Sequence, residues 1–402
     1  MSTHRPLRVA LVCPFGLRPK ATVGTRALPM AQALRRRGHE VTLFVPPWDD
    51  PDPAPGPQVL GGVEVVPVPT DGGPPAIAIR LLRAVLSFRP DLVHIVKSIG
   101  YSAAVAQALR PFGARLSSTP LLLDADDWEG RGGWSDCLAR PAWQRLLISW
   151  QERWCFRHAD AVTVASEALR TIAWSLGARP DRVHHLPNAL ASPLPAADPE
   201  AVAEVRRRHA LQSDTVLLYT RFAEYSPAWP VPFLRSLRAR RPEARLLVVG
   251  QGLRREEEQL RRAAAAASLS HAIVWAGWPG LSHLPALAGA ADTAIFPYQD
   301  SLISRTKCSV KLLELMSLAV PVVASAVGEN VAHLDHGRAG VLVAEPSGAE
   351  AWAEAVAWLL SHRHHAERLG RAAAARVRQR YLWDAVVPTL ERAYDAALAG
   401  RR

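Results

Sequence analysis

Short apolar runs alternate with amphipathic segments along almost the whole chain. The runs are rich in Val, Leu and Ile, whereas the segments between them repeat apolar residues every three or four positions, as helices do. In the first half the runs lie at 8–13, 39–47, 63–68, 92–96, 121–123 and 159–166, and in the second half at 216–219, 245–249, 273–275, 293–296, 320–324 and 341–343. Strands separated by helices predict an α/β fold with parallel, doubly wound sheets.

The length of the chain indicates two domains. Its 402 residues exceed what one ordinary hydrophobic core takes up. The segment 191–199, ASPLPAADP, has the composition of a linker and separates the two series of apolar runs. We therefore expect the first domain to end and the second to begin near residue 190.

Charge and cysteine content narrow the classes of partner and compartment. A formal net charge of +11 and an isoelectric point near 10.1 favour anionic partners such as sugar nucleotides, anionic lipid head groups or nucleic acid. Cys13, Cys137, Cys155 and Cys308 form no C-x-x-C pair, so neither a disulfide framework nor a zinc site is indicated. No apolar stretch reaches the roughly 18 to 20 residues that span a bilayer. The sequence predicts a cytoplasmic protein, neither exported nor transmembrane.

Candidate chemistry is densest at 305–325, RTKCSVKLLELMSLAVPVVAS, which predicts a short helix, a proline stop and a buried strand. With Ser309 as the candidate N-cap, Arg305, Lys307 and Lys311 all fall near the helix start. The helix dipole disfavours cations there, whereas an anion is stabilised by the dipole, the free N–H groups and the cationic side chains. The pattern therefore suits a phosphate or diphosphate.

Part of this segment, KLLELMSLAVPVVA, resembles the donor-site signature of retaining GT-B glycosyltransferases of family four. That signature runs Glu, seven residues, Glu, then Ala-Met-Ala-x-Gly-x-Pro-Val-Val. The resemblance implies that Glu314 binds the ribose hydroxyls of a nucleotide. Thr306 stands in place of the first Glu, which contacts the donor sugar in the family, and Ala319 in place of the usual Gly. On charge alone, Lys311 and Glu314 could equally form an exposed ion pair.

The resemblance implies a fold and an activity for most of the chain. The fold is two Rossmann-like α/β domains facing a cleft: an acceptor domain over 1–190, a nucleotide-sugar donor domain over 191–380 and a final helix over 381–402 that crosses back to the first. The activity is transfer of a hexosyl or related sugar from a nucleotide sugar, with UDP or GDP, to an acceptor hydroxyl. Transfer would retain configuration and need no metal or cofactor, as in glycan or glycolipid biosynthesis.

Further residues of the donor half match the family residue by residue. Arg221, in TRFAE after an apolar run, takes the place of the family's Gly-Arg, which implies a clamp on the diphosphate. The lysine that usually follows six residues later is Pro227 here, so Arg305, Lys307 or Lys311 would supply the second charge. The catalytic set that the resemblance implies is Arg221, Lys311 and Glu314 on the donor side, with one carboxylate on the acceptor side.

Four glycines are candidates for close approach of the backbone to the donor. Gly250 lies in a strand-to-helix turn that resembles the family's nucleotide-base loop, and Gly277 precedes Trp278 in a second such loop. Gly16 and Gly24 follow the first apolar run, without the G-x-G-x-x-G spacing that would indicate NAD. Each of them could also be an ordinary turn glycine.

The candidate acceptor site is the acidic segment 124–129, DADDWE, at the end of an apolar run. Clustered carboxylates repel one another unless a cation, a donor hydroxyl or a metal ion compensates. By resemblance, Asp126 takes the place of a family histidine and, with Asp127 and Asp124, is a candidate contact to the acceptor hydroxyl. The alternatives are a divalent-ion site and an Asx-rich turn that caps the next helix. His94, near another strand end, either lines the same site or is a hydrogen-bonded core residue, and we favour the core.

The segment 128–157 combines tryptophans with arginines. Trp143, Leu147, Trp150 and Trp154 repeat at helical spacing, with Arg140, Arg145, Arg153 and Arg157 nearby. A basic, tryptophan-bearing amphipathic helix is typical of interfacial membrane binding, although packing against the sheet is commoner. Because many relatives in the family act on lipid-linked acceptors, a lipid-linked acceptor and peripheral contact at the inner face of the membrane are implied, and nucleic acid is not.

Two other functions stay open on the sequence alone. A sugar-nucleotide epimerase or hydrolase could use the same fold, with donor turnover in the absence of any acceptor. A non-catalytic sugar-nucleotide or polyanion binder would agree with the loss of Glu at Thr306. Detectable turnover of a donor would exclude that second alternative.

Overall fold

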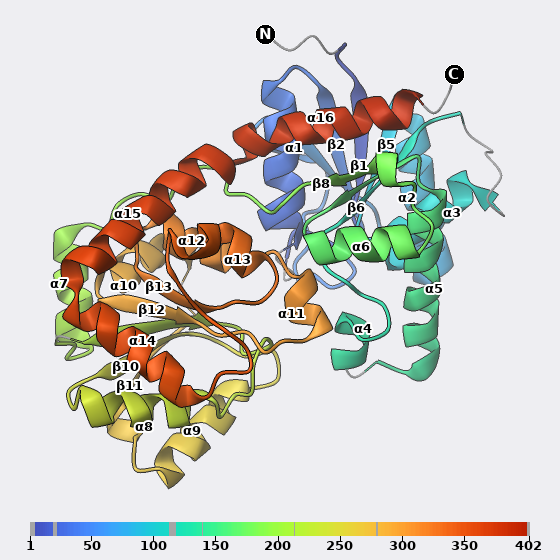
Figure 1. Ribbon diagram of the computed structural model, residues 1–402. Helices are drawn as coiled ribbons and strands as arrows, with labels where there is room; N and C mark the ends of the chain where they lie inside the picture. The colour runs from blue at the N-terminus through green and yellow to red at the C-terminus, as the bar shows by residue number, and fades with distance from the viewer. Residues whose placement is uncertain are drawn as a thin grey trace. The chain divides into compact units, whose positions relative to one another are not determined.

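The computed structural model describes residues 5–18, 22–111, 118–138, 140–212, 214–278 and 280–399. The chain divides into two compact units. Unit 1 comprises Met1–Ala191, Thr306–Cys308 and Leu382–Arg402, and unit 2 comprises Ser192–Arg305 and Ser309–Tyr381. Each unit is built on one largely parallel sheet with helices packed on it (Figure 1), which confirms the expected pair of Rossmann-like α/β domains.

Unit 1 contains an eight-stranded sheet in the order β3-β4-β2-β1-β5-β6-β7-β8. Its strands are β1 Arg8–Val12, β2 Glu40–Val45, β3 Gln58–Leu60, β4 Val63–Pro67, β5 Leu92–Val96, β6 Leu121–Ala125, β7 Ala161–Val164 and β8 Val183–His185. The pairing of β3 with β4 is antiparallel, and the other pairings are parallel. The strand order reverses between β1 and β5, and ligands bind at the carboxyl ends of the strands beside such a reversal.

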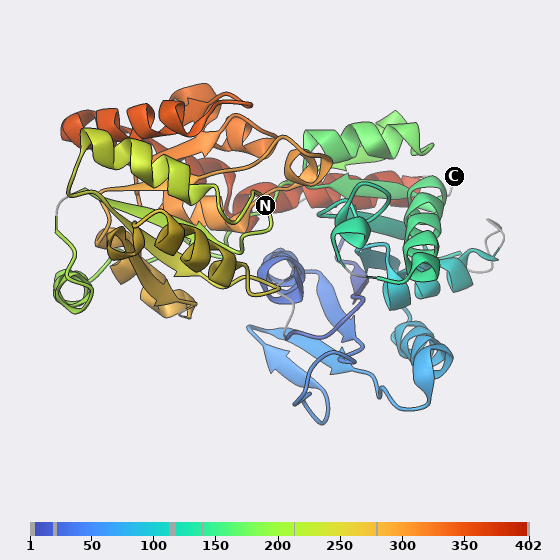
Figure 2. The ribbon, with the colours of Figure 1, turned by 90° about the horizontal axis from the view of Figure 1, so that it is seen from below.

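Both faces of this sheet are covered by helices. They are a π turn at Val23–Ala27, α1 Leu28–Arg36, α2 Gly73–Ser87, α3 Gly100–Leu109, α4 Trp134–Cys137, α5 Ala142–His158, α6 Glu167–Ser175, a 3-10 turn at Pro180–Arg182 and α16 Trp383–Ala399. Because side chains alternate along a strand, Val9 and Leu11 pack with α1 and α16, whereas Ala10 and Val12 pack with α2, α3 and α5. Figure 2 shows unit 1 with its sheet between these helices.

Unit 2 contains a six-stranded parallel sheet in the order β11-β10-β9-β12-β13-β14. Its strands are β9 Thr215–Thr220, β10 Arg245–Gly250, β11 Ile273–Gly277, β12 Thr293–Phe296, β13 Val322–Ser325 and β14 Val341–Val343. Here the order reverses between β9 and β12. Arg221, which follows β9, therefore stands beside the reversal.

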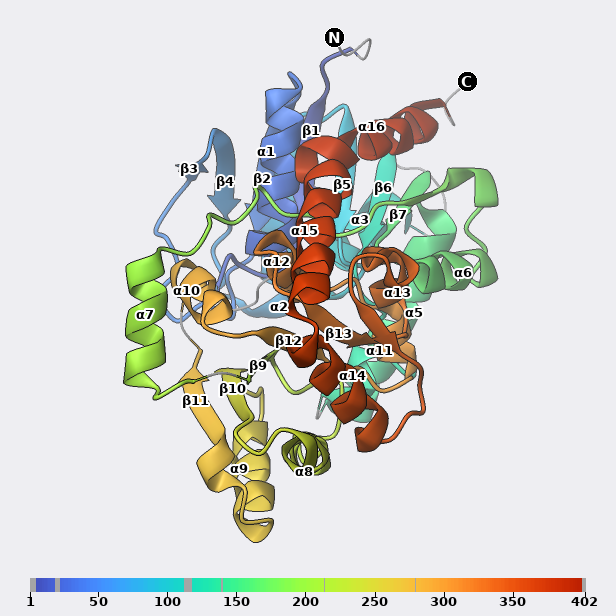
Figure 3. The ribbon, with the colours of Figure 1, turned by 60° about the vertical axis from the view of Figure 1, so that its left-hand side comes forward.

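The α-helices of this part of the chain are α7 Pro199–Arg208, α8 Pro230–Arg240, α9 Glu256–Ala266, α10 Leu284–Gly289, α11 Leu302–Thr306, α12 Val310–Ser317, α13 Glu329–His333, α14 Ala349–Ser361 and α15 Arg363–Arg380. Short 3-10 turns occupy Ser270–Ala272, Leu281–His283 and Asp335–Gly337. One core joins apolar residues of α8, α9 and α14 to the sheet, and α12 packs against α15 (Figure 3).

Two local expectations are corrected by the structure. Strand β6 continues to Ala125, so Asp124 lies inside the strand rather than after it. Arg305 and Lys307 do not stand at the start of α12, because a separate helix, α11, ends at Thr306 and carries Arg305 in its last turn. The sequence from 302 to 306 has too few residues for helical periodicity to show.

Ala319 ends α12 in a left-handed conformation, with φ +57°. The Val320 N–H donates to the Leu315 carbonyl and the Ala319 N–H to the Met316 carbonyl, a pattern in which the left-handed residue is usually Gly. Gly370 of α15 packs closely here, because a Cβ on it would lie 2.0 Å from the Ala319 carbonyl oxygen. The family signature has a glycine at this position, and a glycine would adopt this left-handed conformation without strain.

We expect Ala319→Gly to stabilise unit 2. A left-handed conformation costs an L-residue about 1 to 2 kcal/mol, which exceeds the entropy that glycine adds to the unfolded chain, so the gain should be about 0.5 to 1 kcal/mol. Urea unfolding measures it. Gly370→Ala, on the other side of the contact, should destabilise by about 1 to 3 kcal/mol through overpacking. A destabilising Ala319→Gly would contradict the interpretation.

Candidate active site

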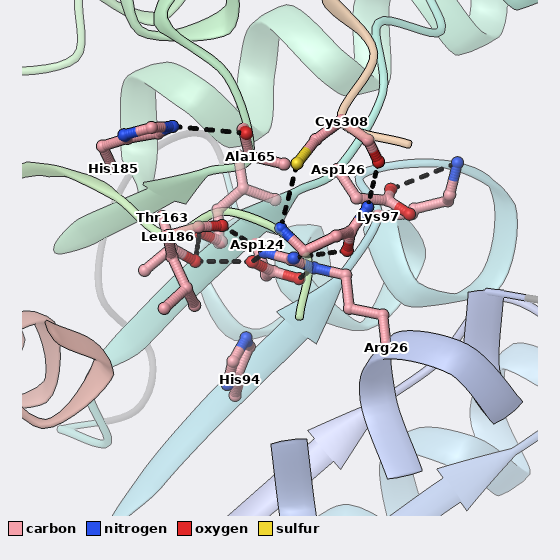
Figure 4. Close-up of polar contacts among 12 residues, drawn as sticks. Arg26, His94, Lys97, Asp124, Asp126, Thr163, Ala165, His185, Leu186 and Cys308 are labelled. Atoms are coloured by element: carbon pink, nitrogen blue, oxygen red, sulfur yellow. Dashed lines mark hydrogen bonds and ion pairs between the residues drawn. The ribbon is translucent and has the colours of Figure 1, made fainter. Parts of the chain in front are cut away.

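A buried ion pair joins Arg26 to Asp124 in unit 1. Arg26 follows the loop after β1, within the π turn, and both side chains are excluded from solvent. The Arg26 Nε donates to Asp124 Oδ2 at 2.7 Å and Nη2 donates to Oδ1 at 2.6 Å (Figure 4). Thr163 Oγ1 also donates to Asp124 Oδ1, at 2.7 Å. Burial alone would raise the pKa of Asp124, but Arg26 and these hydrogen bonds lower it below its usual value.

Asp124 therefore has no exposed oxygen to offer an acceptor. Its expected role changes from ligand contact to the counter-ion of Arg26, because it lies within β6 and its side chain is fully buried. Sequence reasoning missed Arg26. An arginine in the first helix of a βαβ unit carries no signal of burial unless the carboxylate that pairs with it is known.

Asn188 extends the ion pair toward 306–308. Its Oδ1 accepts from Arg26 Nη1 at 2.8 Å, and its Nδ2 donates to the Cys308 carbonyl at 2.6 Å. The Thr306 carbonyl accepts from Ser166 Oγ at 2.8 Å, and the Thr306 side chain is buried. Lys307 places its ammonium 5.0 Å from the centre of the Trp134 ring. The residues 306–308 are thus held by named contacts within unit 1.

Lys97, at the end of β5, is the cation that compensates the acidic segment. Its Nζ lies 3.2 Å from Asp126 Oδ1, 3.1 Å from Asp127 Oδ2 and 2.8 Å from Glu129 Oε1. Strands β5 and β6 are parallel neighbours, with Val96 paired to Asp124. Lys97, which follows β5, therefore lies close to the carboxylates that follow β6. The signal available in the sequence was a lysine directly after the apolar run 92–96. No group of metal-binding geometry occurs among the described residues.

The charges in this cluster are set by burial and by Lys97. Burial raises the pKa of Asp126 to about 6, while Lys97 lowers it and Asp127 raises it further. Burial lowers the pKa of Lys97, but the carboxylates of Asp126, Glu129 and Asp127 outweigh that effect and raise it well above its usual value. Asp126 thus changes charge near neutral pH beside a lysine that stays protonated.

His94 is a core residue. It is fully buried on β5, and its Nδ1 lies 3.0 Å from the Tyr394 hydroxyl of α16. Burial lowers the pKa of His94 to about 4, so the ring is neutral at physiological pH. The structure thus fits the core interpretation and leaves no exposed ring nitrogen for an acceptor.

The glycines after β1 differ in their surroundings. A Cβ on Gly16 would lie 3.0 Å from Pro47, whereas Gly24 lies in the π turn with open space around it. π turns occur frequently at functional sites. The clearer contribution of this segment is the placement of Arg26.

Glu314 and Arg221 gather with two aromatic rings in unit 2. Glu314, on α12, is 7% exposed and shares a hydrogen bond with the hydroxyl of Tyr219 at the end of β9. Trp278 stacks on Tyr219 with ring centres 5.7 Å apart, and the Arg221 guanidinium lies 4.4 Å from the centre of the Trp278 ring. The sequence pointed to Arg221, Trp278 and Glu314 but not to Tyr219, an apolar-run residue like its neighbours.

The Glu314 carboxylate is incompletely satisfied. Over the parts of the chain that are described, its Oε2 is buried without a hydrogen-bond partner. Burial raises the pKa of Glu314 to about 7, although Tyr219 and Lys311 both lower it. Because an unpaired buried carboxylate is costly, the site favours a ligand that donates hydrogen bonds to it.

The remaining donor candidates lie at the ends of β10 and β11 and in the helices α11 and α12. Gly250 ends β10, where a Cβ would lie 2.2 Å from the Thr220 carbonyl, and Gly277 ends β11 with φ +69°. Arg305 is exposed and forms an ion pair with Asp300. Ser309 is the N-cap residue of α12, as expected, although its side chain makes no capping hydrogen bond. Lys311 lies close enough to Glu314 to lower its pKa.

The comparisons with known proteins agree with this geometry. Residues 21–189 match the family model described as Glycosyl transferase 4-like domain, and residues 220–362 match Glycosyl transferases group 1. Sucrose-phosphate synthase from Thermosynechococcus elongatus superimposes with a TM-score of 0.72 at 19% identity, over 98% of this chain and 100% of that one. The fold and site together define a GT-B glycosyltransferase.

The chain belongs to the group 1 glycosyltransferases. Among curated relatives, the GDP-mannose-dependent alpha-(1-6)-phosphatidylinositol monomannoside mannosyltransferase of Mycobacterium tuberculosis is 27% identical over 365 residues, 88% of this chain and 89% of that one. The Anabaena Alr3699/HepE structure in complex with UDP-glucose has a TM-score of 0.69 at 15% identity, over 97% of this chain and 99% of that one. The two family models confirm the expected glycosyltransferase activity.

We expect Glu314→Gln to stabilise the ligand-free protein at high pH only. The pKa of Glu314 rises from 4.5 to about 7 on folding, so ionisation destabilises the native state progressively from pH 4.5 and fully above pH 7. The gain should be up to about 3 kcal/mol at pH 8 and small at pH 4. Urea unfolding at both pH values measures it, and an equal effect at both would contradict the assigned ionisation.

Proposed function

We propose that the enzyme transfers a hexose from GDP- or UDP-sugar to a hydroxyl of a phosphatidylinositol-type lipid, with retention of configuration and without a metal ion. The observation that carries the donor half is the buried Glu314 carboxylate, which has one unpartnered oxygen and shares a hydrogen bond with Tyr219, on which Trp278 stacks. Support for the nucleotide and the lipid comes from the names of the mannosyltransferase relative and of the UDP-glucose complex. Retention follows from the resemblance to a retaining family.

On the donor side each group has a distinct role. Glu314 accepts hydrogen bonds from the ribose hydroxyls, which replaces an unsatisfied buried oxygen with two charge-assisted bonds. Arg221 and Lys311, together with the N-terminal N–H groups of α12, bind the diphosphate and stabilise the charge that develops as it leaves. Trp278 offers an aromatic face to the base. Gly277, which is exposed with open space around it, keeps the backbone accessible, whereas Gly250 is buried against the Thr220 carbonyl.

Arg305, Lys307 and Thr306 contribute less directly in this proposal. Lys311 lies in the first turn of α12, whereas Arg305 lies in α11 and Lys307 lies between the two helices, so we assign Lys311 as the second cation for the diphosphate. Thr306 lacks the carboxylate that contacts the donor sugar in the family. We therefore assign selection of the sugar to neither the Thr306 side chain nor Arg305.

On the acceptor side, Asp126 orients the hydroxyl that receives the sugar. Its carboxylate ionises near pH 6 and is held by Lys97, so at neutral pH it accepts a hydrogen bond from the acceptor. Asp127, which is more exposed and shares the same lysine, is a second contact. Lys97 is a positioning residue that fixes both carboxylates.

A lipid acceptor calls for contact with a bilayer, and α5 offers a surface for it. Trp143, Leu146, Leu147 and Trp150 are all exposed at i, i+3, i+4 and i+7, so they lie on one face. Over the described ranges, no helix is both long enough and apolar enough to cross a bilayer. We therefore propose peripheral attachment at the inner face of the membrane.

We expect neutralising Arg221 or Lys311 to weaken binding of nucleoside diphosphates far more than binding of nucleosides. Glu314→Gln should instead lower affinity for ribonucleotides at least tenfold, and much less for 2′,3′-dideoxy analogues, because charge-assisted hydrogen bonds are worth about 1.5 to 3 kcal/mol. Calorimetric titration separates the phosphate role from the ribose role. Arg235→Gln, at an exposed position on α8, is the matched charge control. Unchanged affinities in all the site variants would remove the donor assignment.

We expect Asp126→Asn to lower transfer at least a hundredfold while donor affinity stays near wild type.

Lys97→Met should shift the acidic limb of the rate profile upward from about pH 6, because the lysine lowers the pKa of Asp126. Lys97→Arg should restore most of the activity. The pH dependence of transfer, with circular dichroism to check folding, measures both. A profile that Lys97→Met leaves in place would show that the lysine is only structural.

A further inference from the structure

An arginine-lined cavity of about 300 Å³ opens in unit 1, away from the acidic cluster. Its walls come from the ends of α3 and α5 and from the segments before β7 and β8, and its charged members are Arg110, Arg157, Asp160, Arg179 and Arg182. These segments precede their strands, whereas Asp126 follows β6. In a parallel sheet, strands of this length separate the two edges by about 15 Å. The cavity is therefore distinct from the proposed acceptor site.

Positive charge exceeds negative charge in this cavity. Arg110 pairs with Asp160 at 2.8 Å, and Asp181 just outside pairs with Arg179 at 2.9 Å and with Arg182 at 3.4 Å. Arg157 is exposed and, within the described chain, forms no ion pair. The planar donor fork of arginine matches the oxygens of a phosphate, so the excess charge suits a phosphate group.

An apolar hollow adjoins the cavity. It has a volume of about 370 Å³, shares Arg157 and His158 with the cavity, and has Trp150, Trp154 and Leu176 in its wall. Trp150 also belongs to the exposed apolar face of α5. A basic cavity thus continues into an apolar wall and then into an exposed aromatic surface, the order of phosphate, glycerol and acyl chain in a phospholipid at an interface.

The charges on α5 favour a bilayer over a second copy of this chain. The exposed charged side chains of this helix are arginines, at 145, 153 and 157, whereas its acid, Glu152, is buried. Two copies meeting through this face would bring arginines against arginines, because a twofold interface pairs a surface with itself. An anionic membrane surface complements the same face.

We propose that the arginine cavity binds the phosphate of an anionic phospholipid in a bilayer, whose apolar part lies along Trp150, Trp154 and Leu176. The site anchors unit 1 to the membrane and is separate from the site at which the acceptor reacts. The inference rests on the proposed function in one respect, that the enzyme works at a membrane. It assigns the contact to a defined cavity rather than to net charge.

The test measures binding of the whole protein to phosphatidylcholine vesicles with and without phosphatidylglycerol. Arg157→Gln/Arg179→Gln removes two cavity charges from exposed positions. Arg35→Gln/Arg83→Gln removes two exposed charges from α1 and α2 as the control. We expect the cavity variant to lose at least tenfold in partition to phosphatidylglycerol vesicles, and the control to stay within about twofold of wild type. Equal losses in the two variants would overturn the proposal in favour of net charge.

Two further measurements distinguish other occupants. If inorganic phosphate raises the melting temperature through the arginines but vesicles do not bind, the site takes a soluble phosphate and the lipid assignment fails. If sedimentation shows a dimer that the cavity variant loses, the face is an interface between copies and the proposal also fails. Nucleoside diphosphate affinity should be the same in all three proteins. If the wild-type protein does not bind nucleoside diphosphate, the proposed function is refuted. The vesicle measurement still decides whether the cavity binds an anionic phospholipid.

Discussion

The buried pair of Arg26 and Asp124 is the interaction on which the organisation of unit 1 depends. Two charges at an interior position lose their hydration, and only complete hydrogen bonding makes that tolerable. The protein meets the requirement with Thr163 on β7 and Asn188 beyond β8, in addition to the pair itself. A single guanidinium thereby ties the first helical turn, the middle of the sheet and the residues 306–308 into one arrangement. Its contribution is specific geometry more than raw stability.

The acidic cluster of Asp126, Asp127 and Glu129 is likewise compensated by a cation, at a position closer to solvent. Lys97 stands among three carboxylates, so any one of them can be near a substrate without mutual repulsion driving the group apart. In unit 2 the reverse holds, because Glu314 keeps one oxygen unsatisfied. One unit thus carries carboxylates whose charge is compensated by a nearby lysine, and the other carries a carboxylate with an oxygen that lacks a hydrogen-bond partner. This contrast fits an acceptor hydroxyl that must be oriented and a nucleotide that must be gripped.

The sequence was informative where chemistry follows local pattern. The alternation of apolar runs predicted both sheets, and the segment around Glu314 could be matched because its helix, stop and strand are contiguous. Arg26 and Lys97 could not be found that way, since each acquires its role from a partner far along the chain. The burial of Asp124 could not be predicted either, because the apolar run ends at Leu123 whereas the strand continues through Asp124 to Ala125. Ser309 shows that a residue can occupy the N-cap position without its side chain making a capping hydrogen bond.

The π turn at Val23–Ala27 has a consequence for how the ion pair can change in related chains. A π turn holds one residue more than an α-helical turn, and each residue rotates a helix by about 100°. Deleting a single residue ahead of Arg26 would therefore swing the guanidinium away from Asp124 while leaving every functional side chain in the sequence. The site is encoded by the count of residues in this turn as much as by their identity, so an insertion or deletion there would alter it more than most substitutions.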